Sequence, residues 1–250
     1  MNGILGNLTP VVKNLLLLNV IMFVVSWLGM QQGIPMINLL GGHVFTSPFF
    51  EPYQMVTHFF MHGGFFHILF NMFALVIFGP ALEQVWGPKR FFIFFIATAI
   101  GAFLLHQFVG YMELSSIKNS MMKQGINITD INLDLKEFAR KNPGVVPGSS
   151  NALINSYAQA AFVPVVGASG AIYGILVAFA YLFPNTQLML LFPPIPVKAK
   201  WLVLFMVGIA LYNSFQNNPG DNVAHLAHLG GALVGFIIVF FWQKNSRNFY

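Results

Sequence analysis

The chain has 250 residues, of which 56% are hydrophobic and 8% are charged, and its mean hydropathy is +0.69. These values exclude an ordinary soluble domain, in which about 45–50% of residues are apolar and about 25% are charged. The sequence contains no cysteine, so disulfide bonds and cysteine metal ligands are excluded as well.

Six apolar stretches predict membrane-spanning helices. Five reach the length of about 17–25 residues that crosses a bilayer, and one is slightly short but is bounded by Gly167 and Pro184. The predicted helices cover about 14–30, 64–82, 90–111, 167–184, 198–215 and 223–243. The first stretch lacks a small-residue cleavage site, so we predict a retained helix rather than a signal peptide. The expected fold is an all-α, polytopic membrane protein with a single domain over residues 1–250.

The basic residues predict how these helices are oriented. Those near the N-terminus, in the second and fourth connections and near the C-terminus are Lys13, Lys89, Arg90, Lys198, Lys200, Lys244 and Arg247. The first and fifth connections contain no Lys or Arg, so the positive-inside rule places both termini in the cytoplasm. The net charge of +5 is thus explained by membrane topology and does not indicate a nucleic-acid partner. We expect a multi-pass protein in the lipid bilayer of a bacterial cell membrane.

The connection between the third and fourth helices, about 112–166, is the least hydrophobic part of the chain. Its sequence "TDINLDLKEFARKNPG" predicts a short amphipathic helix, with Thr129 or Asp130 as N-cap and Asn142-Pro143-Gly144 as the stop. We expect an enlarged external loop. A substrate-handling role and a plain surface insertion are both compatible with this pattern.

Four polar side chains are predicted to lie at a similar depth in the membrane. The second, fourth and sixth helices run from the outer face inward, so residues near their beginnings lie in the outer half of the bilayer. Ser169 begins the fourth helix, and His228 lies about five residues into the sixth. His67 and Asn71 are four residues apart at the start of the second helix, hence on one face. Polar groups that face lipid are costly, so these side chains are expected to converge in a site.

Small residues predict that the fourth and sixth helices pack closely. They recur with a spacing of four in Gly170-x-x-x-Gly174 and in Ala227-x-x-x-Gly231-x-x-x-Gly235. His228 shares the glycine face of its helix, so its imidazole comes within hydrogen-bond reach of Ser169 if the two faces meet. An imidazole beside a serine is the minimum for nucleophilic acyl transfer, in which Oγ attacks a carbonyl carbon.

Three motifs resemble the signatures of the rhomboid intramembrane serine proteases. They are "GASG" followed by Tyr173, "HGGFFHILFN", and "AHLGGALVG". In order and spacing they match G-x-S-G on the fourth helix, H-x-x-x-x-H-x-x-x-N entering the second, and a histidine followed by spaced glycines on the sixth. The resemblance covers essentially the whole membrane core. It implies a six-helix rhomboid-like bundle and a serine-type endopeptidase that uses no cofactor and no metal.

The resemblance also implies roles for single residues. Ser169 would be the nucleophile and His228 the general base. His67 and Asn71 would donate hydrogen bonds to the oxyanion, beside the backbone N–H of Ser169. No carboxylate is placed to orient His228, so the resemblance implies a dyad rather than a triad.

Other positions match supporting residues of the family. His62 is the first histidine of the second-helix motif, and Gly167 precedes the nucleophile as the G-x-S-G motif requires. Tyr173 would pack against the ring of His228. Glu83, in "ALEQVWG", resembles the glutamate that ends the second helix in relatives, and we expect it to have a structural role.

The remaining histidines are assigned by the same resemblance. His225 lies three residues before His228, but only His228 has glycines at the family spacing, so the base is assigned to His228. His43, His58 and His106 are expected to be ordinary interfacial residues.

The chain departs from the family in its first connection, which carries Tyr53-Gln54 where relatives often have Trp-Arg. This loop, expected at the membrane interface, must therefore pack without the arginine. The implied substrates are membrane proteins whose transmembrane helix unwinds near the outer face. They would enter beside the fifth helix and place small residues in a narrow pocket beside Gly170.

Two other functions are compatible with the residues. A catalytically silent rhomboid-like protein would bind transmembrane clients without cutting them, although such proteins typically lose the serine or the histidine. A metal-binding transporter would use the histidines as ligands, although no carboxylate or cysteine accompanies them inside the membrane. Its ligands would come from His58, His62, His67, His225 and His228.

Overall fold

The computed structural model describes residues 8–190, 194–215 and 222–246. Six apolar helices follow one another in the order of the predicted spans. They are α1 (Pro10–Gln31), α4 (Phe65–Trp86), α5 (Pro88–Lys123), α8 (Ser169–Leu182), α9 (Ala199–Ser214) and α10 (Asn222–Ser246). The helices α1, α4, α5 and α10 are long and apolar enough to cross a membrane, and α8 and α9 are shorter apolar helices. The prediction of an all-α, polytopic membrane protein is confirmed.

Shorter elements fill the connections between these helices. They are α2 (Met36–Leu40), α3 (Gln54–Thr57) and η2 (His58–Phe60) in the first connection, α6 (Ile128–Lys141) and α7 (Ala152–Phe162) in the third, and β1 (Gln187–Met189) with β2 (Pro196–Lys198) in the fourth. The two strands pair antiparallel, with Leu188 opposite Val197. We did not predict this hairpin, because three-residue strands carry too little periodic signal in the sequence.

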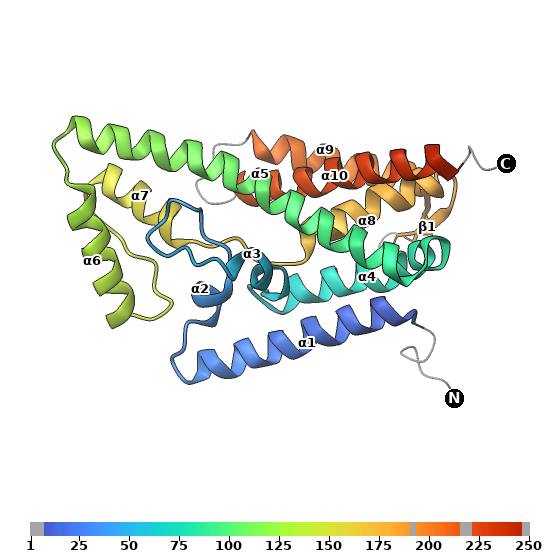
Figure 1. Ribbon diagram of the computed structural model, residues 1–250, viewed down its shortest axis with the longest axis horizontal. Helices are drawn as coiled ribbons and strands as arrows, with labels where there is room; N and C mark the ends of the chain where they lie inside the picture. Colours follow the sequence, from blue (N-terminus) through green and yellow to red (C-terminus); the bar gives the residue numbers. More distant parts are fainter. Residues whose placement is uncertain (1–7, 191–193, 216–221, 247–250) are drawn as a thin grey trace.

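The six apolar helices alternate in direction along the bundle. In Figure 1, α4, α8 and α10 run from left to right, and α1, α5 and α9 run the opposite way. The beginning of α1, the β-hairpin and the end of α10 therefore share one end of the molecule. The helices α2, α3, α6 and α7 gather at the other end, where α4, α8 and α10 begin.

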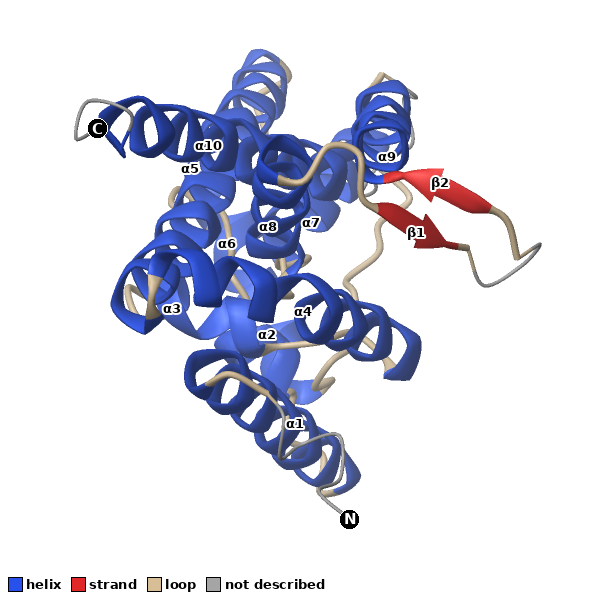
Figure 2. Ribbon diagram, turned by 90° about the vertical axis from the view of Figure 1, so that its right-hand side faces the viewer, coloured by secondary structure: helices blue, strands red, loops and turns tan. Residues whose placement is uncertain are grey.

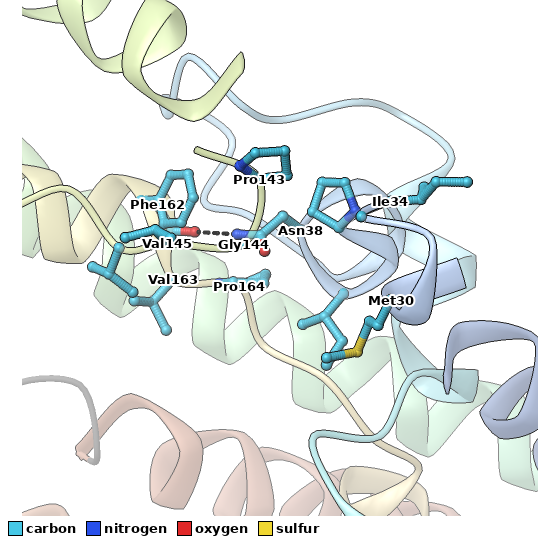
Figure 3. A pocket seen from close by; sticks show the side chains of 13 residues that line it. Met30, Ile34, Asn38, Pro143, Gly144, Val145, Phe162, Val163 and Pro164 are labelled. Atoms are coloured by element: carbon cyan, nitrogen blue, oxygen red, sulfur yellow. Dashed lines mark hydrogen bonds between the residues drawn. The ribbon is translucent and has the colours of Figure 1, made fainter. Parts of the chain in front are cut away.

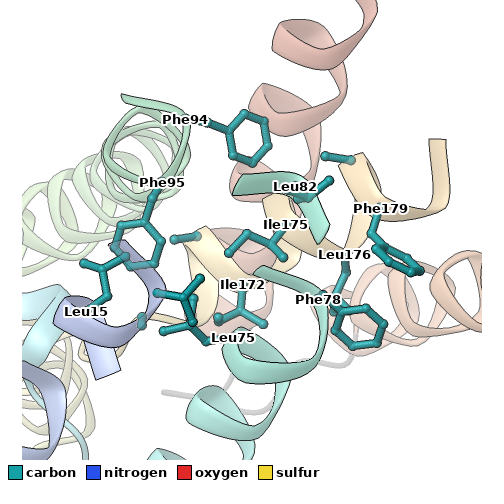
Figure 4. Packing of buried hydrophobic residues seen from close by; sticks show 14 of the residues in the cluster. Leu15, Leu75, Phe78, Leu82, Phe94, Phe95, Ile172, Ile175, Leu176 and Phe179 are labelled. Carbon is teal, nitrogen blue, oxygen red and sulfur yellow. The ribbon is translucent and has the colours of Figure 1, made fainter. Parts of the chain in front are cut away.

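The main hydrophobic core forms around α8. This helix contacts α4, α5, α9 and α10, and it lies near the centre of the bundle when the helices are seen end-on (Figure 2). Its residues are apolar on every side, which is typical of a helix buried on all faces. Figure 4 shows Ile172 and Ile175 of α8 packed among Leu75 of α4 and Phe95 of α5.

Small residues bring α8 and α10 into backbone contact. A Cβ added to Gly231 would collide with the backbone of Gly170, and one added to Gly235 would lie 2.6 Å from the Cα of Gly174. The predicted meeting of the two glycine faces is therefore confirmed. Because the backbones touch, the positions of Ser169 and His228 relative to each other are set by rigid helix packing.

The third membrane helix, α5, is longer than predicted. Its 36 residues span roughly 54 Å at 1.5 Å per residue, well beyond the about 30 Å of hydrocarbon in a bilayer. We expected it to end near residue 111, where the sequence becomes polar. A change in polarity does not end a helix, and the chain continues in α-helix until Gly125, which has a φ of +74°.

Residues 112–166, called here the inserted segment, have a second hydrophobic core of their own. Its buried residues are Val44, Leu114, Met121, Leu135, Tyr157, Ala158 and Ala161. All but Val44 come from the inserted segment, so this segment is a packed helical unit rather than a plain loop. The amphipathic helix α6 is present as predicted, but its N-cap is Asn127, whose side chain accepts a hydrogen bond from the N–H of Thr129. Our assignment of Thr129 or Asp130 as the cap was wrong because both already lie within the helix.

Glu83 connects the second membrane helix to the first. Its buried carboxylate accepts hydrogen bonds from the N–H groups of Val11 and Val12, at 2.9 and 3.0 Å. These are free N–H groups of the first turn of α1, where a negative charge also interacts favourably with the helix dipole. Glu83 thus caps α1 from a neighbouring helix.

Candidate active site

Ser169 is the first residue of α8, and the backbone before it requires a glycine. Gly167 has a φ of +113°, a conformation that residues with a Cβ rarely adopt. A Cβ at this position would also lie 2.7 Å from Nε2 of His67. The turn that presents the serine is therefore possible only with glycine at 167.

The side chains of Ser169 and His228 meet between α8 and α10. The distance between Oγ of Ser169 and Nε2 of His228 is 2.8 Å, which is a good hydrogen bond. When the hydroxyl donates, Nε2 is the acceptor and Nδ1 of His228 carries the ring hydrogen. This Nδ1 is buried and has no hydrogen-bond partner among the described residues.

The ring of His228 is held in place by aromatic stacking. The ring of Tyr173 lies parallel to it, with the centroids 4.5 Å apart and an angle of 7° between the planes. Tyr173 is four residues after Ser169, so the same face of α8 carries both the hydroxyl and the stacking partner. The ring of His225 packs edge-on against His228 with centroids 5.9 Å apart. The hydrogen bond with Ser169 is made by the ring of His228.

Two hydrogen-bond donors from α4 point toward the turn before Ser169. Nδ1 of His67 accepts a hydrogen bond of 3.4 Å from the N–H of Gly63, so Nε2 carries the hydrogen in the neutral ring. Nε2 faces Gly167, and Nδ2 of Asn71 lies 3.5 Å from where a Cβ of Gly167 would be. Nδ2 is buried without a partner among the described residues. Both donors are thus available to an oxyanion beside Ser169.

A cavity of about 130 Å³ opens beside the serine, and we call it the Ser169 cavity. Its walls include His58, His67, Gly167, Gly170 and His228. No acidic or basic residue other than these histidines lines it, so its character is apolar with a few polar atoms. Among the described residues that line this cavity there is no carboxylate.

Two further histidines stand beside this cavity. His62 is buried and packs edge-on against the ring of His67, with centroids 5.1 Å apart. Burial, and secondarily repulsion from His67, lowers the pKa of His62 to about 4. Burial likewise lowers the pKa of His58 to about 4, although its hydrogen bond to the carbonyl of Gln54 acts in the other direction. Both rings are therefore neutral near pH 7.

His43, His58 and His106, which we expected to be ordinary interfacial residues, are all buried within the protein. His58 even lines the Ser169 cavity, and we did not predict that. Its spacing of four from His62 was the only signal in the sequence, and that spacing indicates a shared side without indicating which cavity it borders. Within the described part of the chain, no three His, Cys, Asp or Glu side chains are arranged to hold a metal ion.

A larger cavity, of about 420 Å³, lies where the inserted segment meets the first loop, residues 32–64 (Figure 3). It is walled by Met30, Ile34, Val145 and Val163, among others, and Asn38 donates a hydrogen bond of 3.4 Å to the carbonyl of Phe162. The chain that lines this cavity at residues 162–164 continues into the wall of the Ser169 cavity at 165–167. The inserted segment thus docks on the first loop close to the turn before Ser169.

The fold and the site together define a class of protein. A polytopic helical bundle carries a serine and a histidine in hydrogen-bond contact, with unpaired donors beside them. The comparison with known families agrees with this class. Residues 13–249 match the family described as "Eukaryotic integral membrane protein (DUF1751)", and the similar curated proteins are rhomboids. The chain belongs to the rhomboid family of integral membrane proteins.

Several named relatives share this similarity. RHOMBOID-like protein 12, mitochondrial, of Arabidopsis thaliana is 29% identical over 188 residues, which cover 74% of this chain and 45% of the relative. Rhomboid protein 1, mitochondrial, of Saccharomyces cerevisiae is 26% identical over 185 residues, covering 74% and 40%. Putative rhomboid protease YdcA of Bacillus subtilis is 26% identical over 202 residues, covering 80% and 72%. The chain spans less than half the length of the two mitochondrial relatives.

Proposed function

We propose that this chain is an intramembrane serine endopeptidase that cleaves transmembrane helices of other membrane proteins. The observation that supports it best is the 2.8 Å contact between Oγ of Ser169 and Nε2 of His228 inside a cavity. His67 lines the same cavity, and the Nδ2 donor of Asn71, unpaired among the described residues, faces Gly167 beside it. These two side chains offer the second requirement of acyl transfer, a place for the oxyanion.

The proposed reaction follows from these positions. Nε2 of His228 takes the proton of the Ser169 hydroxyl while Oγ attacks the scissile carbonyl carbon. The oxyanion accepts hydrogen bonds from Nε2–H of His67, from Nδ2–H of Asn71 and from the backbone N–H of Ser169. The protonated His228 then gives its proton to the leaving amine, and water hydrolyses the acyl-enzyme by the same steps.

In this proposal the stacked ring of Tyr173 takes over the orienting task that a carboxylate has in a triad. A parallel contact at 4.5 Å fixes the plane of the imidazole, and the electron-rich face of the phenol ring stabilises the imidazolium that forms during attack. The mechanism therefore needs no third hydrogen-bonded residue.

The substrates are proposed from the shape and depth of the site. A Cβ on Gly170 would collide with Ala102, so α8 and α5 pack closely at the wall of the cavity. From the resemblance we propose that small side chains near the cut fit the narrow pocket beside Gly170. The beginnings of α4, α8 and α10 share one end of the bundle, which the charge pattern assigns to the external face. We propose that transmembrane helices enter beside α9 and are cut near that face.

The membrane in which the chain works is also a proposal. We expected a bacterial cell membrane, with both termini in the cytoplasm. The matched family is described as eukaryotic, and two relatives are named as mitochondrial. The bacterial location therefore stays a prediction, while the integral membrane character is established by the apolar helices.

Replacing the two central residues tests the activity. Ser169→Ala and His228→Ala should each abolish cleavage of a model transmembrane substrate in proteoliposomes, because the nucleophile or its base is lost. A fluorophosphonate probe should label the unmodified chain at Ser169, as shown by mass spectrometry of the labelled peptide.

The controls distinguish the protease from a silent rhomboid-like protein. Both variants should keep the circular dichroism spectrum and unfolding temperature of the unmodified chain. Cleavage that persists in both variants would refute the dyad. A folded, unmodified chain that binds transmembrane clients but is neither labelled nor active would favour the silent alternative.

A further inference from the structure

Gln54 is the most extensively hydrogen-bonded side chain of the first loop, residues 32–64. Its Oε1 accepts from the N–H groups of His43 and Glu51, at 3.3 and 3.1 Å. Its Nε2 donates to the carbonyls of Leu39 and Phe49, both at 3.2 Å. The side chain is buried, so these four bonds have little competition from water.

The segment that leads into Ser169 is held by the first loop at two points. Val165 exchanges two backbone hydrogen bonds with Gly42, at 2.8 and 3.0 Å. Gly167 donates its N–H to the carbonyl of His58 at 2.9 Å. These are the two residues on either side of Val166, so the path of the chain just before the nucleophile is set by partners outside α8.

Both anchors connect directly to Gln54. His43 follows Gly42 in the chain, and its N–H is one of the two that Oε1 of Gln54 accepts. Nδ1–H of His58 donates to the backbone carbonyl of Gln54 at 2.7 Å. Gln54 is therefore the common point from which Gly42 and His58 are placed.

We propose that Gln54 is a positioning residue for the nucleophile. By holding Gly42 and His58 at a fixed separation, it fixes residues 165–167 and hence the direction of the Ser169 side chain. This inference rests on the proposed function for its effect on reactivity, but the placement of residues 165–167 can be measured without any activity.

The amide is essential to this arrangement because it both accepts and donates. A guanidinium has five N–H donors and no acceptor. Arginine at 54 could still donate to Leu39 and Phe49, but the N–H groups of His43 and Glu51 would face other donors. Gln54→Arg, which keeps the donors and loses the acceptor, should therefore disturb the site.

The experiment compares two buried glutamines that bond to the same loop. Gln54→Met and Gln54→Arg are the test variants. Gln107→Met is the matched control, because Gln107 is buried, accepts from the N–H of Phe45 and donates to the carbonyl of His43. Each full-length protein is purified in detergent. The readouts are the rate constant of fluorophosphonate labelling at Ser169, hydrogen–deuterium exchange of residues 163–168, and the unfolding temperature.

Both Gln54 variants should lower the labelling rate between about tenfold and hundredfold, the usual cost of misplacing a reacting group by about 1 Å. They should also speed exchange of the Gly167 amide, while exchange within α8 stays unchanged. Gln107→Met should alter the unfolding temperature but neither of the other readouts. If Gln54→Met does not fold, Gln54→Glu replaces it as the test variant. The Glu side chain keeps an acceptor oxygen and loses the two N–H donors of the amide.

Two results would overturn the inference. One is a folded Gln54 variant whose exchange at residues 163–168 equals that of the unmodified chain. The other is an equal effect of Gln107→Met, which would show that any loosening of the loop suffices. If the unmodified chain is not labelled at all, the proposed function fails, and the exchange measurement alone then decides the role of Gln54.

Discussion

At the scale of single residues, the site depends on a position that has no room for a Cβ. Gly167 adopts a left-handed conformation and leaves space for the ring of His67 and the amide of Asn71. The side chains of His67 and Asn71 can approach the turn before Ser169 only because Gly167 has no Cβ to separate them from it. Glycine is therefore needed at 167 for two physical reasons: the left-handed backbone conformation, and the close approach of the side chains of His67 and Asn71.

Gly167→Ala should therefore impair the site more than the fold. Its Cβ would displace His67, so the rate of fluorophosphonate labelling and the kcat for a transmembrane substrate should fall by about tenfold to hundredfold. Gly208→Ala is the control, because Gly208 lies in α9 with open space around it and should be neutral or slightly stabilising. A Gly167→Ala protein that is labelled at the unmodified rate would contradict this account.

At the scale of elements, the helices are joined by polar contacts as well as by apolar packing. Glu83 of α4 caps the first turn of α1, and the backbones of α8 and α10 meet at paired glycines. In a bilayer the hydrophobic effect does not drive helices together, so close packing and buried hydrogen bonds have to do so. Glu83 thus adds hydrogen bonds between α1 and α4 to the apolar packing of Val12 and Leu15 in the main core.

Glu83→Ala should lower the free energy of unfolding by about 1.5–3 kcal/mol, because two backbone N–H groups lose a charged acceptor. Glu83→Gln should cost less, since its amide oxygen still accepts. Steric-trap or denaturant unfolding in micelles measures the difference. Glu137→Ala, which removes only an exposed pair with Lys141, should change stability by less than about 1 kcal/mol. Equal losses for Glu83→Ala and Glu137→Ala would exclude the capping role.

At the scale of the whole molecule, two hydrophobic cores stand end to end. The membrane core surrounds α8, and the second core holds the far end of α5 together with α6 and α7. Lys118 donates to the carbonyl of Thr46, and Ser47 donates to that of Ala161, which joins the inserted segment to the first loop. The inserted segment is thus a separate packing unit that is bonded to the first loop and leads, through residues 161–166, into the turn before Ser169.

Leu135→Ala should loosen this second unit alone. Leu135 is buried in the second core, and its truncation should cost about 2–5 kcal/mol within that core. Hydrogen–deuterium exchange should increase in α6 and α7, while α8 and α10 keep their protection. Leu133→Ala, an exposed change on the same helix, is the control. An equal increase of exchange in α8 would show that the two cores unfold together.

Local patterns in the sequence predicted a large part of this protein. Hydropathy located six apolar helices, and glycine spacing predicted the faces on which α8 and α10 meet. The motif residues Ser169, His228, His67 and Asn71 were named from spacing and resemblance, and the structure brings them to one cavity or its edge. Their catalytic roles stay predictions. The prediction failed where several neighbouring residues could serve as the N-cap of one helix. Asn127 caps α6, although Thr129 and Asp130 are also residue types that cap helices.

The sequence by itself determined the membrane spans, the contact between two helices and the residue types of the site, because these depend on periodicities of a few residues. Only the tertiary structure decided the 2.8 Å contact of Ser169 with His228, the burial of His58 and the network around Gln54. Those features join residues separated by long stretches of chain or depend on what packs around them. A local sequence pattern does not predict which backbone groups a buried amide side chain will bond to, so the hydrogen-bond partners of Gln54 follow from the fold alone.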